Sequence, residues 1–367
     1  MFDRKKIQFS SLSTRENKVS IEKDFVSTDD TPAVLPAETS DLIKQISGEI
    51  REARRIDAPV ILAFGAHTIK NGMSPVLRTM INKNYITHLA TNGAGIIHDW
   101  EFAFQGKSSE DVRSNVNKGQ FGIWEETGYY LNLAIAVGAY EGKGYGESIG
   151  SMVLNDGLMI PEISILKSEI TRILDSNPAQ AAAAADLLSL IVDFSIKPGF
   201  LTIKHRYKEF GLQSEAFRLG VPFTGHPMFG HDIIYTHPVN CGAAIGRTAE
   251  RDFLKYAESV SRLEGGVYLS VGSAVMSPMI FEKSLSMAQN VWLQQGKKIE
   301  NHKIYVVDLA KSSWDWTRGE PPSTDPAYYL RFLKTFNRMG GSMNYISADN
   351  RDFLLTLYQE LEMAEPI

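Results

Sequence analysis

The chain has 367 residues, of which 43% are apolar, and 38 basic side chains stand against 43 acidic ones for a formal charge of −5. A chain this long buries about three quarters of its unfolded surface, so it forms one large domain or two without metal or disulfide support. Its single cysteine, Cys241, excludes structural disulfides and cysteine-ligated clusters and fits a reducing compartment. The slightly negative net charge argues against nucleic-acid binding and favours small-molecule partners.

The first residues are polar and contain no apolar stretch that would serve as a signal peptide. The longest apolar window, Tyr129 to Tyr140, is too short for a membrane-spanning helix and predicts a buried helix instead. We therefore expect a cytoplasmic protein with no membrane partner. Residues 1–40 mix charge, Ser/Thr and Pro without a period, which indicates an arm that wraps the core or a neighbouring subunit.

From residue 40 onward, helical and strand patterns alternate. Ser40 is the predicted N-cap of a helix, and the apolar run 58–64 predicts a buried parallel strand. A helix over 75–82, a strand over 86–90, a glycine turn over 91–95 and a helix from about 97 follow. A mostly helical stretch follows over about 108–195, and we interpret it as an insertion in the domain. This order of elements predicts a parallel sheet with helices on both faces.

The alternation returns in the second half of the chain. Strands are predicted over 221–224, 266–271, 303–308 and 343–347, and helices over 251–263, 278–293, 326–339 and 350–360. Six or seven strands with such crossovers predict an α/β fold: a doubly wound, mostly parallel sheet related to the Rossmann fold. Residues 41–367 are expected to form this single domain, with the helical insertion inside it.

Ligands of such sheets bind beyond the carboxyl ends of the strands, where glycines let backbone N–H groups approach a phosphate. The strict G-x-G-x-x-G fingerprint is absent, so ordinary turn chemistry remains an alternative for these glycines. Capping of the last helix is an equal alternative for Asp349. The candidate dinucleotide-binding residues at these strand ends are Thr91, Asn92, Gly93, Gly272, Ser273 and Asp349.

Histidines beside carboxylates gather near the same predicted edge. A histidine next to an acid in a cleft suits proton transfer near neutral pH, whereas the alternative for any one of them is a hydrogen-bonded, half-buried side chain. No H-x-x-x-H or H-x-H pair is present, and no metal site is predicted. The candidate catalytic residues are His98, Asp99, Glu101, His226, His231, Asp232 and His237.

Several segments together resemble the deoxyhypusine synthase family. Thr91-Asn-Gly-Ala-Gly95 resembles its T-T-A-G-G turn, Asp232-Ile-Ile-Tyr-Thr-His237 its D-M-I-F-F-H segment, and Tyr345-Ile-Ser-Ala-Asp349 its V-Y-A-D-A strand end. The resemblance implies an NAD-binding α/β domain, a homotetramer with active sites between subunits, and oxidation of an amine by NAD, which then returns the hydride. In the family, the V-Y-A-D-A strand end touches the adenine half of NAD.

The chain departs from this family at the catalytic lysine, because Val275 stands at the corresponding position. Without that amine no imine between lysine and substrate forms, which argues against deoxyhypusine synthesis itself. The segment from Asn92 to Gly106, with His98-Asp99 and Glu101, also resembles NAD-dependent ornithine cyclodeaminases. That resemblance implies a lysine-independent reaction in which NAD takes a hydride from an amino acid, ammonia leaves and the hydride returns.

These observations predict an NAD-dependent enzyme that carries out a redox-neutral transformation of a small amine or amino acid, in a homo-oligomer and most simply a tetramer. This prediction has two forms. The enzyme is either a transferase similar to the deoxyhypusine synthases or a lyase of the ornithine cyclodeaminase type. An alternative from a different class is a non-catalytic NAD-binding scaffold or metabolite sensor.

Overall fold

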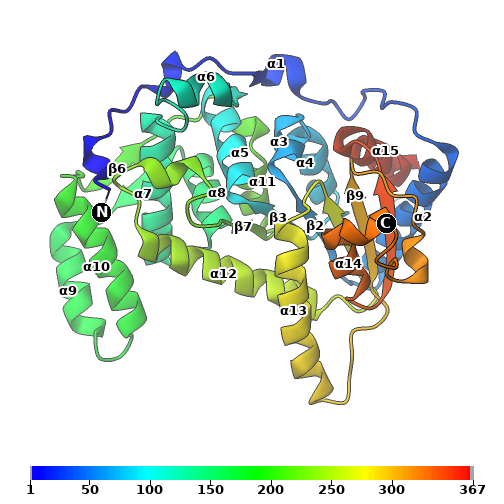
Figure 1. Cartoon of the computed structure of the whole chain (residues 1–367). Coiled ribbons are helices and arrows are strands. Elements are labelled where there is room, and N and C mark those ends of the chain that lie inside the picture. Colours follow the sequence, from blue (N-terminus) through cyan, green and yellow to red (C-terminus); the bar gives the residue numbers. More distant parts are fainter. Residues whose placement is uncertain (1, 364–367) are drawn as a thin grey trace. The chain divides into compact units, whose positions relative to one another are not determined.

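The computed structural model describes residues 2–363 (Figure 1). The chain divides into two compact units. Unit 1 comprises residues up to 23 together with 96–218 and 224–252, and unit 2 comprises 24–95, 219–223 and 253 onward. Within residues 2–363, no helix is both long enough and apolar enough to cross a membrane. Whether the two units fold as the single domain expected over 41–367 stays a prediction.

A six-stranded sheet, almost all of it in unit 2, organises the fold. Its order is β10-β9-β8-β2-β3-β7, and the strands with a recorded register, from β10 to β3, are parallel. Taken in chain order, these strands read 3-2-1-4-5-6, which is the Rossmann arrangement. The predicted doubly wound α/β fold is therefore confirmed. The strands are β2 (Val60–Phe64), β3 (His88–Asn92), β7 (Phe223–His226), β8 (Val267–Val271), β9 (Lys303–Asp308) and β10 (Ser342–Ser347).

Strand β2 shows why this sequence forms a central strand. All five of its residues are buried, so both faces of the sheet are covered there, as an uninterrupted apolar run requires. Helix α2 (Ala37–Arg55) packs against β2, β8 and α15 (Asn350–Met363), and α15 also contacts α4 (Ser74–Asn82). The helices α13 (Met276–Leu293) and α14 (Arg331–Asn337) pack against each other, and α14 contacts β10.

Aromatic side chains fill the core between the sheet and the helices α13 and α14. Tyr268 of β8 stacks on Phe281 of α13 with ring centroids 4.2 Å apart, and Phe336 of α14 lies 6.0 Å from Phe281. The Tyr268 hydroxyl contacts the hydroxyls of Tyr256 and Ser277 at 2.8 Å, so this buried polar group is paired. The packing accounts for the helical pattern predicted over 278–293.

Unit 1 is mainly helical. Its central helix is α7 (Glu125–Glu141), eleven of whose residues are buried, and it packs against α8 and α10. The buried helix predicted around residues 129–140 is therefore present. The other helices are α6 (Val112–Asn117), α8 (Tyr145–Asn155), α9 (Ile163–Ile173), α10 (Pro178–Asp193) and α11 (Leu212–Leu219); α5 (Gly93–Gln105) and α12 (Gly242–Ser261) cross the boundary between the units.

Short elements complete the chain. Two antiparallel ribbons lie in unit 1, β1 with β4 and β5 with β6. The helices α1 (Ile21–Asp24) and α3 (Ala66–Lys70) are single turns, and residues 2–363 also contain six 3₁₀ turns outside the helices and strands. The ribbon strands are β1 (Val19–Ser20), β4 (Lys107–Ser108), β5 (Gly157–Ile160) and β6 (Gly199–Thr202).

The structure corrects several details of the sequence prediction. The residues of the glycine turn predicted over 91–95 belong to the end of β3 and the start of α5, and the helix predicted over 326–339 is a 3₁₀ turn followed by the short α14. Helix α2 begins at Ala37 after Pro36, so Ser40 lies inside the helix and is not its N-cap. Proline is compatible with a helix start because it lacks the N–H that the first turn leaves unpaired. The stretch 108–195 contains β5, which pairs with β6 beyond it; with only four residues per strand, this ribbon is too short to show a reliable period.

Candidate functional site

A cavity of about 220 Å³ lies at the carboxyl edge of the sheet in unit 2. The segments that follow β2, β8, β9 and β10 line it, which is where ligands bind to sheets of this topology. Two of the strand-end residues predicted from sequence, Gly272 and Asp349, lie together at this edge. The lining residues are His67, Asn71, Gly272, Val307, Asp308, Leu309, Ala348, Asp349 and Asn350.

Two glycines lie at the strand ends beside this cavity, and one of them, Gly272, lines it. A Cβ atom on Gly65 would lie 2.1 Å from the carbonyl oxygen of Gly272, so only glycine permits the ends of β2 and β8 to approach this closely. Gly272 has φ +57°, and a Cβ there would meet only the Asn350 amide, at 3.8 Å. The absence of a side chain at Gly272 therefore leaves space beside the strand end.

Polar side chains form another part of the wall. Asn71 donates to the Oδ1 of Asn350 at 2.8 Å, which ties the segment after β2 to the start of α15. Asp349 caps α15 by accepting from the N–H of Arg351 at 2.8 Å, and Asp308 accepts from the N–H of Ala310 at 3.1 Å. The cavity thus presents two carboxylates held by backbone hydrogen bonds at adjacent strand ends.

The six candidate dinucleotide-binding residues all lie in unit 2, and two of them, Gly272 and Asp349, line the cavity. The Ser273 hydroxyl accepts from the N–H of Ser277, in the first turn of α13, at 3.2 Å. Thr91 is fully buried and donates to the carbonyl of Phe64.

The other two candidates belong to the turn after β3. Asn92 accepts from the N–H of Gly95 at 2.9 Å, and Gly93 opens α5 immediately after the strand. These contacts order the strand end, and the binding role of all six residues stays a prediction.

The cavity fits part of a dinucleotide. Its volume is below the 300–1,000 Å³ or so typical of a complete small-molecule pocket, so one half of the cofactor at most lies within it. The open Gly272 cradle and the two carboxylates suit a nucleoside with free ribose hydroxyls. The sequence did not single out Asp308, Asn71 or Asn350 as binding residues.

The seven candidate catalytic residues all lie in unit 1. Asp99 is buried and accepts three hydrogen bonds: from the N–H groups of Leu212 and Gln213 and from the Gln213 amide, at 2.9 to 3.0 Å. It therefore holds the start of α11. Such a carboxylate has its acceptor capacity largely occupied by the protein itself.

Glu101 forms a buried bidentate ion pair with Arg15 of the N-terminal arm, at 2.7 and 2.6 Å. Burial on its own raises the pKa of Glu101, but the Arg15 charge and the hydrogen bonds from Arg15 and Ser108 outweigh it and lower the pKa. The Ser108 hydroxyl donates to Glu101, so the Nδ1 of His98, 2.7 Å from the same hydroxyl, carries a proton and donates to it.

His237 and His231 differ in their surroundings. His237 is 3% exposed and packs against the rings of Phe9 and Tyr129. Its Nδ1 accepts from the N–H of Val239, and burial lowers its pKa although Glu125 opposes this shift. His231 is exposed in the loop that follows β7.

Asp232 and His226 have the strongly perturbed pKa values expected of functional groups. Burial raises the pKa of Asp232 to about 7, and its Oδ2 is buried without a hydrogen-bond partner among residues 2–363. Burial lowers the pKa of His226 to about 3, so the ring is neutral at physiological pH, and its Nε2 lies 2.9 Å from the Thr224 hydroxyl.

Two tyrosines accompany Asp232 that sequence reasoning did not single out. Burial raises the pKa of Tyr145 and of Tyr235, and the Asp232 carboxylate adds to the shift of both. The Tyr235 hydroxyl is also buried without a hydrogen-bond partner in the described part of the chain. Tyr235 falls inside the quoted 232–237 segment, but nothing in its local pattern separates it from a core tyrosine. In this group, the Oδ2 of Asp232 is a buried acceptor without a hydrogen-bond donor among residues 2–363.

In the described chain, no three His, Cys, Asp or Glu side chains come together in a way that would hold a metal ion.

The chain matches no protein-family model and no curated protein. Among solved structures, unliganded AgrE is 15% identical with a TM-score of 0.45, and the match covers 90% of this chain and 34% of AgrE. ArgZ, an arginine dihydrolase from the ornithine-ammonia cycle in Cyanobacteria, is 13% identical with a TM-score of 0.43, covering 90% of this chain and 33% of ArgZ. This chain spans about a third of the length of both.

A putative LOR/SDH protein from Methanococcus maripaludis S2 is 14% identical with a TM-score of 0.45, covering 93% of this chain and 73% of that one. AgrE also has a structure in ternary complex with ornithine and NAD⁺. The resemblance to deoxyhypusine synthases gains no support from these comparisons.

Proposed function

We propose that this protein is an NAD-dependent enzyme that carries out a redox-neutral transformation of a small amine or amino acid. Unit 2 is the proposed dinucleotide-binding part, with one half of NAD in the cavity at the carboxyl edge of its sheet. Asp232 of unit 1 is the proposed site for the cationic amine of the substrate.

The observation that supports NAD binding most directly is the coincidence of topology and cavity. The strand order is that of Rossmann folds, and the cavity lies at the carboxyl ends of the strands with Gly272 and Asp349 in its wall. Carboxylates at strand ends accept hydrogen bonds from ribose hydroxyls, and a glycine in the left-handed region lets the backbone approach the ligand closely.

The observation that supports an amine substrate is the unmet acceptor of Asp232. A buried carboxyl group with a pKa of about 7 is half protonated near neutral pH. An ammonium group placed against it stabilises the ionised form, because an opposite charge within about 4–6 Å lowers the pKa of an acid. Asp232 is therefore suited to bind a cation or to receive its proton.

NAD, when bound, supplies a hydride acceptor that returns the hydride within one turnover. The chain's own residues have the remaining tasks in this proposal. Asp232 holds the ammonium group and accepts a proton from it, and neutral His226 is the second candidate for proton transfer. His98, Asp99, Glu101, His231 and His237 remain proposed members of the site, but the contacts of Asp99, Glu101 and His237 are those of structural residues.

Calorimetry with NAD on matched capping variants tests the cofactor site. Asp349→Ala removes the cap of α15 and one cavity carboxylate, whereas Asp325→Ala removes an equivalent backbone cap, to the N–H of Ala327, outside the cavity. Each loses about 1 kcal/mol of capping energy. We expect NAD affinity to fall at least about tenfold only in Asp349→Ala, as loss of a hydrogen bond to a charged group predicts. No binding to the wild-type protein would contradict the proposal.

Mass spectrometry of small amines and amino acids incubated with protein and NAD tests the chemistry. A redox-neutral reaction changes the amine without net accumulation of reduced cofactor. Asp232→Asn should slow turnover by at least about a hundredfold, the low end of an acid–base contribution, and leave NAD affinity nearly unchanged. Borohydride treatment should give no covalent adduct, because Val275 stands where the family lysine would be. An adduct on Lys283 would contradict this part of the proposal.

Two alternative functions remain proposals: a specific lyase and a protein without catalytic activity. In an ornithine cyclodeaminase-type lyase, ammonia would be released from the amino acid, so an ammonia assay with ornithine distinguishes it. The contacts of Asp99 and Glu101 favour a non-catalytic NAD-binding scaffold. Both carboxylates belong to the segment that resembles ornithine cyclodeaminases, and both are already bound by other residues of the chain. For the scaffold we expect NAD binding that Asp232→Asn leaves unchanged, and no conversion of any amine.

A further inference from the structure

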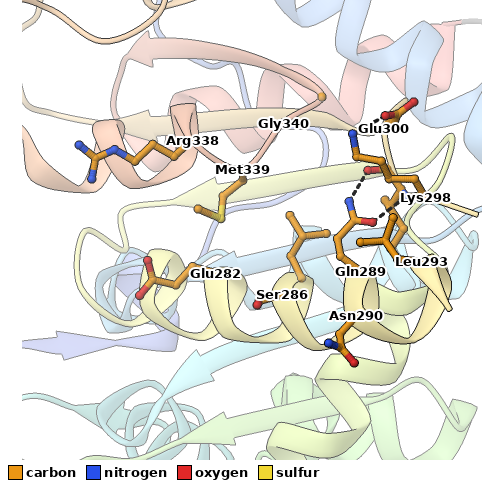
Figure 2. A pocket seen from close by; sticks show the side chains of 13 residues that line it. Glu282, Ser286, Gln289, Asn290, Leu293, Lys298, Glu300, Arg338, Met339 and Gly340 are labelled. Carbon is orange, nitrogen blue, oxygen red and sulfur yellow. Dashed lines mark hydrogen bonds and ion pairs between the residues drawn. The ribbon is translucent and has the colours of Figure 1, made fainter.

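A groove of about 660 Å³ lies in unit 2, away from the cavity described above (Figure 2). Its walls are the C-terminal two thirds of α13 and the turns that precede β9 and β10, so it lies at the amino ends of these strands. Ligands of this topology bind at the opposite, carboxyl edge. The apolar part of this α13 groove is formed by Leu285, Leu293, Ile299 and Met339.

The backbone contacts around the groove make it a preformed feature. Gln289 donates to the carbonyl of Ile299 at 2.7 Å and accepts from its N–H at 3.1 Å, as Figure 2 shows, which holds the turn before β9 against α13. Gly341 has φ +63°, and a Cβ there would lie 2.3 Å from the carbonyl oxygen of His302. The turn before β10 therefore requires glycine to keep this shape.

An exposed apolar ridge runs along the same helix. We define the α13 ridge as Met279, Met287 and Val291, whose side chains are 51%, 43% and 55% exposed. Their spacing in multiples of four residues places them in one row over about 18 Å of helix. The end of the helix adds Leu293 at 58% exposure, which also lines the groove. Ridge and groove thus lie on adjacent faces of α13.

The rim of the groove carries both signs of charge. Glu282 pairs with Lys283, Lys298 with Glu300, and Arg338 with Glu320, all through side chains 29% to 58% exposed. Exposed pairs of this kind contribute at most about 1 kcal/mol each, so they rearrange at little cost. A rim of mixed sign is complementary to itself, because a two-fold axis can bring the acids of one copy to the bases of another.

We propose that the α13 ridge and the α13 groove together form a docking surface for a second copy of this chain. A two-fold symmetric interface uses the same patch on both subunits, so it needs a ridge and a recess side by side, and α13 supplies both. The i, i+4 row of one helix packs between the corresponding rows of its mate, as in the commonest class of helix packing. A small ligand fits the groove less well, because the amide of Gln289 in its wall is already bonded to the backbone of Ile299.

Light scattering on the full chain tests the surface. The substitutions Met287→Glu and Val291→Glu together place two acids in the ridge, and we expect the molar mass to fall at least twofold relative to the wild type. The control is Val192→Glu on α10, because Val192 is equally exposed at 56% but lies in unit 1. A monomeric wild type, or a double variant that keeps the wild-type mass, would overturn the proposal.

A cross-linking experiment avoids dependence on the charged variant, whose folding circular dichroism would check. In a Cys241→Ser background, Met287→Cys leaves one thiol, which can be linked only to the same thiol of another copy. We expect a short bismaleimide to give covalent dimers of Met287→Cys in at least tenfold higher yield than of Val192→Cys. Equal yields would overturn the proposal. Neither experiment depends on NAD binding or catalysis.

Discussion

Arg15 and Glu101 form a buried bidentate ion pair between residues 86 positions apart in the chain, with side chains only 2% and 1% exposed. Arg15 belongs to the segment that sequence analysis reads as an arm, and Glu101 belongs to the segment read as a catalytic motif. The pair fastens residues 2–23 to the rest of unit 1.

Replacement of Arg15 by Met should therefore destabilise the protein strongly. It leaves the Glu101 carboxylate buried without its counter-charge, a change that costs about 3–5 kcal/mol in comparable buried pairs. Urea unfolding measures the loss. The matched control is Lys18→Met, since Lys18 pairs with Asp111 through side chains 54% and 51% exposed and should change stability by less than about 1 kcal/mol. Equal losses in both variants would contradict this assignment.

The same pair predicts acid sensitivity. Because the native pKa of Glu101 is lowered from 4.5, its contribution to stability is fully present above pH 4.5 and disappears as the pH falls through the lowered native value. We expect the unfolding free energy of the wild type to decline more steeply below pH 4.5 than that of Glu101→Gln. Urea titrations of both proteins at a series of acidic pH values measure this difference, and parallel curves would contradict it.

Asp232 predicts the opposite pH dependence. Its native pKa of about 7 exceeds the ordinary 3.8, so the folded protein holds this proton longer than the unfolded chain does. Stability due to this group therefore declines as the pH rises from about 4 to about 7. Asp232→Asn should be more stable than the wild type at pH 8, by at most about 4 kcal/mol at 1.36 kcal/mol per pKa unit, and nearly equal to it at low pH.

Urea unfolding at the two pH values measures this effect. Asp175→Asn, at an exposed position, serves as the control and should match the wild type throughout. A gain in stability that is the same at both pH values would show that the carboxyl group of Asp232 is not the cause. A loss of turnover together with a gain in stability is the pattern expected of a functional residue.

Substitution by alanine should have opposite effects on stability at Gly48 in α2 and at Gly65 after β2. Gly65→Ala places a methyl group against the Gly272 carbonyl, so the ends of β2 and β8 must separate, at a cost of about 1–3 kcal/mol. Gly48→Ala lies in α2 with nothing within 4 Å of the new Cβ, and should add about 0.5–1 kcal/mol of stability. Thermal unfolding compares the two, and a tolerated Gly65→Ala would contradict the close approach.

The sequence by itself determined where the buried strands lie. An uninterrupted apolar run such as 60–64, followed by Gly65, is typical of a strand inside a sheet that is covered on both faces. The alternation of such runs with helical periods was sufficient to predict the doubly wound fold and the collection of Gly272 and Asp349 at one edge.

Only the tertiary structure decided what each polar residue contacts. The partners of Asp99 and Glu101 lie 113 and 86 residues away, and no local pattern reveals that a buried acid is already bound by Leu212 or Arg15. The unmet acceptor of Asp232 is visible only once burial is known. Local sequence specifies the period and the turns, whereas desolvation and pairing depend on contacts that folding creates between distant segments.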